Sequence, residues 1–135
     1  MEWMSAAAVF VGGGLGAVLR YYLERFLAPR RTSDALISAV FVINVLGSLA
    51  LGIVGAAVNV LGGQDAIAYA GLSLGLLGGF TTFSTAMVEA VQALLAARYA
   101  RFVMLWLVQP TLSLLVLITG YTAAAAVFLA VFSAR

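Results

Sequence analysis

Side chains that bind ions gather in one short stretch of an otherwise apolar region. The segment from Gly75 to Ala86 carries two adjacent glycines, four hydroxyls and two phenylalanines. Hydroxyls donate hydrogen bonds to an anion, and the edges of phenyl rings carry the positive end of the ring quadrupole. Backbone carbonyls released from an interrupted helix would instead bind a cation. This segment therefore has groups suited to ions of either sign.

Three further polar side chains lie within apolar sequence. Asn44 stands in the middle of an apolar run, where an unpaired amide in hydrocarbon is costly. It therefore needs a partner, and a hydrogen bond between helices and the lining of a polar path both remain open. Gln109 and Ser113 are four residues apart, a spacing that places them on one face of a helix.

Arg20 and Glu89 are the ionisable residues most embedded in apolar sequence. Such groups mark functional sites in membranes, although both lie near the ends of apolar runs and could extend to the interface. The chain has no cysteine or histidine, so disulfides and the usual zinc and copper sites are excluded. No nucleophile lies beside a base, so we predict no catalytic residue and favour passage of an ion.

The composition defines the elements that must position these residues. Of 135 residues, 64% are hydrophobic and 9% are charged, against roughly 25% charged in a soluble domain. Four apolar runs each approach or exceed the roughly 20 residues of a spanning helix. We predict an all-α membrane protein with one domain, 1–135, and four transmembrane helices at about 4–27, 35–59, 66–97 and 102–132. The few basic residues argue against a nucleic-acid partner.

The predicted third helix is too long to be simple. At 1.5 Å per residue it measures about 50 Å, against a hydrocarbon core of about 30 Å. Gly78 and Gly79, followed by Thr81 and Thr82, are the natural place for a break, near residues 78–82. In the fourth helix, Pro110 is expected to cause a kink.

Glycines recur at spacings that allow helices to approach closely. Gly12 and Gly16 share one predicted helix, and Gly71, Gly75 and Gly79 share another. Close helix packing is the usual role of such glycines in membranes. For Gly79, and for Gly78 beside it, the neighbouring hydroxyls and rings favour a functional role.

Three motifs together resemble the Fluc fluoride channels, also called CrcB proteins. They run from Gly13 to Arg20, from Asn44 to Ser48 and from Gly78 to Thr85, and their order and spacing fit the family along essentially the whole chain. The resemblance implies a multi-pass protein of the cell (plasma or inner) membrane that exports fluoride passively. It also implies an antiparallel, dual-topology-type dimer with two pores at the subunit interface and a structural sodium ion at its centre.

The family's functional residues map onto positions already singled out. The resemblance assigns the carbonyls of Gly78 and Thr81 to sodium, and Arg20 and Glu89 to the vestibule. The predicted fluoride pore is lined by polar groups and one ring: Asn44, Thr82, Phe83, Ser84, Gln109 and Ser113.

Two features depart from the family pattern. Members usually carry a second pore phenylalanine three positions after the first, and Ala86 stands there. Basic residues are also biased: Arg30, Arg31, Arg98 and Arg101 lie in the first and third predicted loops, which predicts those loops inside and the termini outside. A homodimer remains possible, but a heterodimer with a paralogous subunit of opposite bias that retains the second phenylalanine would account for both departures.

A small multidrug-resistance-type proton-coupled transporter is the main alternative, because it too is an antiparallel dimer of four-helix subunits. That class needs a carboxylate in the middle of the first helix. Glu2 and Glu24 instead flank the first apolar run, which argues against it. A membrane scaffold that transports nothing is a third possibility, in which the break would serve packing alone.

Overall fold

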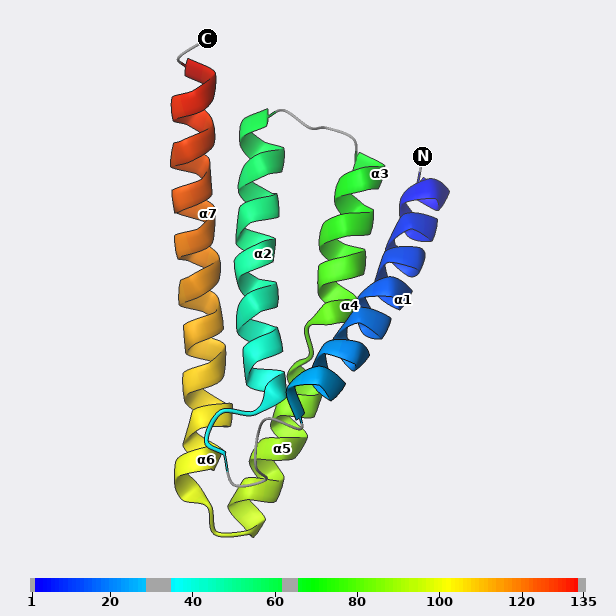
Figure 1. The fold of residues 1–135 in the computed structure, drawn as a ribbon. Coiled ribbons are helices and arrows are strands. Elements are labelled where there is room, and N and C mark those ends of the chain that lie inside the picture. The colour runs from blue at the N-terminus through cyan, green and yellow to red at the C-terminus, as the bar shows by residue number, and fades with distance from the viewer. Residues whose placement is uncertain (1, 29–34, 62–65, 134–135) are drawn as a thin grey trace.

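The computed structural model describes residues 2–28, 35–61 and 66–133, and their regular structure is entirely helical. Within these residues, four helical segments are long and apolar enough to cross a membrane: Trp3–Leu27, Ala39–Val60, Ala70–Leu95 and Tyr99–Ser133. Figure 1 shows both termini at the same end of the bundle. The prediction of an all-helical chain with four spans is therefore confirmed.

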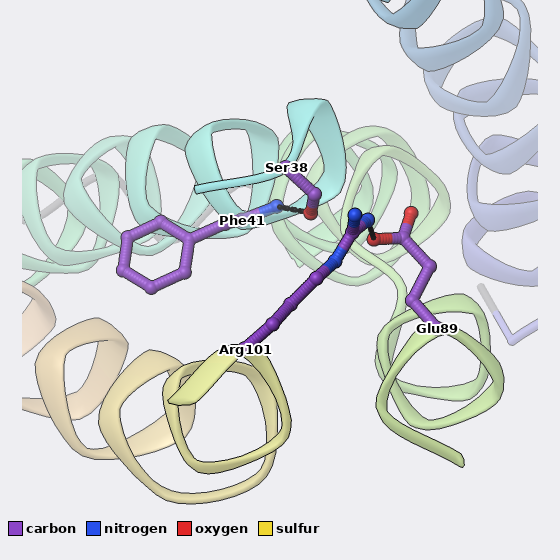
Figure 2. Close-up of polar contacts among 4 residues, drawn as sticks. All are labelled: Ser38, Phe41, Glu89 and Arg101. Atoms are coloured by element: carbon purple, nitrogen blue, oxygen red, sulfur yellow. Dashed lines mark hydrogen bonds and ion pairs between the residues drawn. The ribbon is translucent and has the colours of Figure 1, made fainter. Parts of the chain in front are cut away.

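The first two spans are the single helices α1 (Glu2–Leu27) and α2 (Ala39–Leu61). The second helix begins later than the predicted residue 35, because Ser38 caps it. Ser38 Oγ accepts a hydrogen bond from the Phe41 backbone N–H at 3.1 Å, which satisfies a donor that the first helical turn leaves open (Figure 2). This cap is buried, so the start of α2 is fixed.

The short helix α3 (Ala66–Tyr69) leads into the third span, which is built from three pieces: the π-helical segment η2 (Ala70–Leu77), α4 (Gly78–Phe80) and α5 (Phe83–Leu95). Helical geometry continues through Gly78 and Gly79 and stops at Thr81, where ψ is 153°. Thr82 is also extended, with ψ of 118°. The chain thus leaves helical geometry after the glycine pair, at the two threonines.

Glycines allow α1 to pack directly on the backbone of the third span. A Cβ built on Gly12 would overlap the Gly71 carbonyl oxygen, and one built on Gly16 would overlap that of Leu76. Gly79 lies against the Gly13 backbone in the same way, so its role is close packing. Gly78 differs, because it is exposed and a Cβ there would meet only the Ser73 carbonyl oxygen at 3.9 Å.

The fourth span comprises α6 (Tyr99–Val103), the π-helical segment η3 (Met104–Val108) and α7 (Gln109–Ser133). It begins at Tyr99, three residues before the predicted start. Pro110 lies just after η3, and the missing proline N–H is consistent with a wider helical turn at this point. In Figure 1, α7 runs alongside α2, and these two helices are in extensive contact.

The corner between α5 and α6 is a tight helix end. Ala97 has a φ of 56°, in the left-handed region that glycine usually occupies. The Ala97 N–H donates to the Leu94 carbonyl at 3.0 Å, and the Arg98 N–H donates to the Ala93 carbonyl at 2.8 Å. This pair of hydrogen bonds is the Schellman motif, which turns the chain back toward the membrane.

Candidate functional site

Asn44 of α2 holds the interruption in the third span by two hydrogen bonds. Its Nδ2 donates to the Thr82 carbonyl oxygen at 2.7 Å, and the Thr82 N–H donates to its Oδ1 at 2.8 Å. Both residues are buried, so these bonds replace the helical partners that extended backbone cannot reach. A side-chain amide has two N–H donors, and the Thr82 carbonyl uses one of them.

The Thr82 side chain then begins the next helix. Its Oγ1 accepts a hydrogen bond from the Thr85 N–H at 3.4 Å and lies 3.2 Å from Thr85 Oγ1 and 3.3 Å from Ser84 Oγ. Three hydroxyls are therefore clustered at the N-terminal end of α5. The positive end of the helix dipole is at the same place and favours a negative charge.

A pocket of about 310 Å³ opens beside this cluster. It brings together residues from α2, the interruption, the start of α5 and the first turns of α7. The pocket is lined by eleven residues: Asn44, Ser48, Leu51, Thr81, Thr82, Phe83, Gln109, Pro110, Ser113, Leu114 and Leu117. Five of the six predicted pore residues thus share one cavity, and the sixth, Ser84, contacts it through the Thr82 hydroxyl.

Two polar atoms of this pocket have unused hydrogen-bonding capacity. Gln109 is only 3% exposed, yet within the described part of the chain its Oε1 has no hydrogen-bond partner, and the same holds for the buried Oγ of Ser113. Buried polar atoms are normally paired, so these two unpaired atoms mark a departure from the usual packing of a membrane-spanning region. The two positions follow the spacing of four residues that places them on one face of α7.

Two neighbouring positions of α5 have opposite surroundings. Phe83 is 65% exposed and forms part of the pocket rim, whereas Ala86 is fully buried within the subunit. Ala86 occupies the position at which the family resemblance leads one to expect a second ring. The Ala86 side chain is therefore packed inside this chain and does not face the pocket.

Replacing Ala86 with phenylalanine should destabilise the protein. A phenyl ring at a site with no exposed surface overpacks the core, which typically lowers the free energy of unfolding by about 1–3 kcal/mol. Val88→Phe is the matched control, because Val88 lies on the same helix and is 56% exposed. Denaturant unfolding of both variants in detergent measures the difference, and equal stability of the two would contradict the packing role of Ala86.

The two vestibule candidates do not line this pocket. Glu89 forms an ion pair with Arg101 of α6, with 3.3 Å between Oε2 and Nη2, as Figure 2 shows. Arg20 lies half-buried on α1. The pairing of Glu89 with Arg101 could not be predicted from the sequence, because it depends on the turn at Ala97.

Comparison with known proteins assigns a family. Residues 7–121 match the family of CrcB-like proteins, Camphor Resistance (CrcB). The chain is 40% identical over 87 residues to the fluoride-specific ion channel FluC of Methylobacterium nodulans, which covers 64% of this chain and 68% of the relative. It is 44% identical over 92 residues to FluC 1 of Corynebacterium jeikeium, which covers 61% and 65% of the two chains.

A third relative extends the comparison. FluC 2 of Cutibacterium acnes is 43% identical over 91 residues, which covers 67% of this chain and 72% of the relative. The family match spans all but the ends of the chain, and with four spanning helices it indicates a multi-pass membrane protein. The chain therefore belongs to the CrcB-like family of FluC fluoride-specific ion channels, a family of channels and not of enzymes.

Proposed function

We propose that this chain is a subunit of a fluoride channel that lets fluoride leave the cell passively and so lowers fluoride toxicity in the cytoplasm. The observation that carries the proposal is the pocket in which Asn44, Thr82 and Ser113 present polar groups at the N-terminal end of α5. The family relatives named as fluoride-specific channels support the identity of the ion. The inside-negative membrane potential of the cell membrane would drive the anion outward.

Fluoride is small and strongly hydrated, so a pore must replace its water molecules with hydrogen-bond donors. The remaining Asn44 N–H and the hydroxyls of Thr82, Ser84 and Ser113 would serve as donors in the pocket. Gln109 adds its amide NH₂ group, because a half-turn of the amide exchanges the unpartnered oxygen for N–H donors. The positive edge of the exposed Phe83 ring completes the set.

A second subunit would close the pore. The pocket is open on one side, and the exposed Phe83 ring stands at its rim, so lipid or another chain must cover it. Lipid tails cannot form hydrogen bonds with the amides and hydroxyls that line the pocket, whereas polar groups of another subunit can. An antiparallel dimer with pores at its interface would meet this need.

A structural sodium ion at the dimer centre fits the geometry of the interruption. In a continuous helix the Thr82 N–H would donate to the Gly78 carbonyl, but here it donates to Asn44 Oδ1. The Gly78 carbonyl thus loses its usual helical donor, and Gly78 is exposed. Thr81, three residues later, has an extended backbone. The carbonyl oxygens of Gly78 and Thr81 would hold the ion, whose charge would join the two subunits.

The partner subunit is either a second copy or a paralogue. The buried Ala86 cannot provide the second pore ring. A paralogous subunit with phenylalanine at the corresponding position would supply that ring. The relatives named FluC 1 and FluC 2 are consistent with two-gene systems in this family.

Growth on fluoride tests the proposed function and the choice of partner. In a bacterium that lacks its own fluoride exporter, we expect the chain to restore growth at millimolar fluoride, either alone or with a paralogous subunit. Rescue by the chain alone would support the homodimer, and rescue only by both chains would support the heterodimer. If the protein is present in the membrane and neither strain grows, the channel proposal is wrong.

A further inference from the structure

Gly47 of α2 lies against the interruption in the third span, three residues after Asn44. It is buried, and a Cβ built on it would overlap Thr81 Cγ2 and lie 3.1 Å from Phe80 Cδ1. All the atoms nearest to this Cβ belong to side chains of the interruption or of the residue just before it. The glycine therefore makes room for the two side chains that directly precede Thr82.

The Thr81 side chain has little freedom to move away from Gly47. Its Oγ1 donates to the Leu77 carbonyl oxygen at 3.1 Å, and its backbone N–H donates to the same oxygen at 3.0 Å. Threonine is branched at Cβ, so the rotation that would carry Cγ2 away from α2 would also break the Oγ1 hydrogen bond. A methyl group at position 47 would therefore either break this hydrogen bond or move the interruption away from α2.

Phe80 is held between two helices. Its ring is buried and lies against Gly47 of α2. Its backbone nitrogen lies close to α1, because a Cβ built on Gly16 would be 2.9 Å from that nitrogen. Protein interiors are close-packed, so a displacement of Phe80 by α2 would have to be taken up by α1.

The spacing between α2 and the interruption determines whether Asn44 reaches Thr82. The two hydrogen bonds between these residues are 2.7 Å and 2.8 Å long. An N–H···O hydrogen bond is lost within about 1 Å of extra separation between its heavy atoms. Because Thr82 Oγ1 begins α5, the hydroxyls clustered there would move with it.

We propose that Gly47 is a positioning residue of the pore, an inference that rests on the proposed function as a fluoride channel. The absence of a side chain sets the distance between α2 and the interruption at which Asn44 binds the Thr82 backbone. The hydroxyls at the start of α5, and the pocket beside them, depend on that distance. Gly47 does not line the pocket, so it acts through Phe80 and Thr81.

A double-mutant cycle of Gly47→Ala and Thr81→Ser tests the proposal. Serine keeps the hydroxyl that donates to Leu77 but lacks Cγ2, the atom that the added methyl group would overlap. Gly47→Ala should lower fluoride flux from liposomes about tenfold by itself but at most about threefold in the Thr81→Ser background, because residues in contact couple by energies of this order. Flux is measured per folded, membrane-inserted protein, so a loss of stability alone leaves it unchanged.

Hydrogen exchange of the Thr82 amide gives a second readout, which does not require fluoride conduction. The Asn44 Oδ1 atom protects this N–H, so its exchange should become about tenfold faster in Gly47→Ala and should slow again when Thr81→Ser is added. If the unmodified chain conducts no fluoride, alone or with a paralogous subunit, the proposed function fails. The exchange rates then still decide whether Gly47 sets this hydrogen bond.

Gly55→Ala is the matched control on the same helix. A Cβ built on Gly55 would meet Tyr121 Cδ2 at 3.6 Å, which is an ordinary van der Waals contact, so we expect unchanged flux and exchange. The positioning role would be overturned if Gly47→Ala caused equal losses in both backgrounds. It would also be overturned if Gly47→Ala left the flux and the Thr82 exchange of a conducting channel unchanged.

Discussion

Replacing Asn44 with leucine is expected to abolish fluoride flux and to destabilise the protein. Leucine removes both hydrogen bonds to Thr82 and leaves a buried N–H and a buried carbonyl without partners. Each unsatisfied group costs about 1–3 kcal/mol, so the free energy of unfolding should fall by about 2–6 kcal/mol. Flux from liposomes should drop at least tenfold, because the interruption and its hydroxyl cluster lose their geometry.

Asn59→Leu is the control for this experiment, since Asn59 lies on the same helix. Its Nδ2 donates to the Tyr121 hydroxyl at 3.0 Å, but both groups are accessible and can exchange this bond for others. We expect flux and stability close to those of the unmodified protein. If Asn44→Leu also retained normal flux, Asn44 would neither hold the interruption in place nor line the pore.

Gly16→Ala should separate α1 from the third span. The added Cβ overlaps the Leu76 carbonyl oxygen and lies 2.9 Å from the Phe80 backbone nitrogen, so backbone atoms would have to move. Overpacking of this kind costs about 1–3 kcal/mol, and more where the obstacle is backbone. Unfolding in detergent should show the loss, and flux should fall as well because Phe80 precedes the interruption directly.

Gly14→Ala is the control on the same helix. A Cβ built on Gly14 meets no atom of the described residues within 4 Å, and Gly14 is exposed. Alanine favours helix over glycine by about 1 kcal/mol, so this variant should be as stable as the unmodified protein or more stable. Equal destabilisation of both variants would show that helix contact does not explain the requirement for glycine at position 16.

The sequence was sufficient to predict the four spans and most of the pocket. Long apolar runs have few structures available in a membrane, because each span must satisfy its own backbone. Asn44, Gln109 and Ser113 were predictable for the same reason: a polar side chain in such a run must meet something polar. The structure brings these three together, although their roles in binding fluoride remain proposals.

The details that the sequence did not reveal depend on contacts between distant segments. The interruption lies at Thr81 and Thr82 because Asn44, 38 residues away from Thr82, binds that backbone. The pair of Glu89 and Arg101 requires Ala97 to adopt a left-handed conformation without the glycine that usually marks it. The π-helical geometry of η2 has no counterpart in the local sequence, unlike that of η3, which Pro110 follows closely.

The most direct test is fluoride efflux from liposomes that contain the purified protein, followed with a fluoride electrode. We predict rapid efflux of fluoride and no comparable efflux of chloride under the same gradient. The test is made with the chain alone and with a paralogous subunit, because Ala86 is compatible with either a second copy or a paralogue as the partner. A folded, membrane-inserted protein that releases neither ion, or both at equal rates, would contradict the account of a fluoride-selective channel.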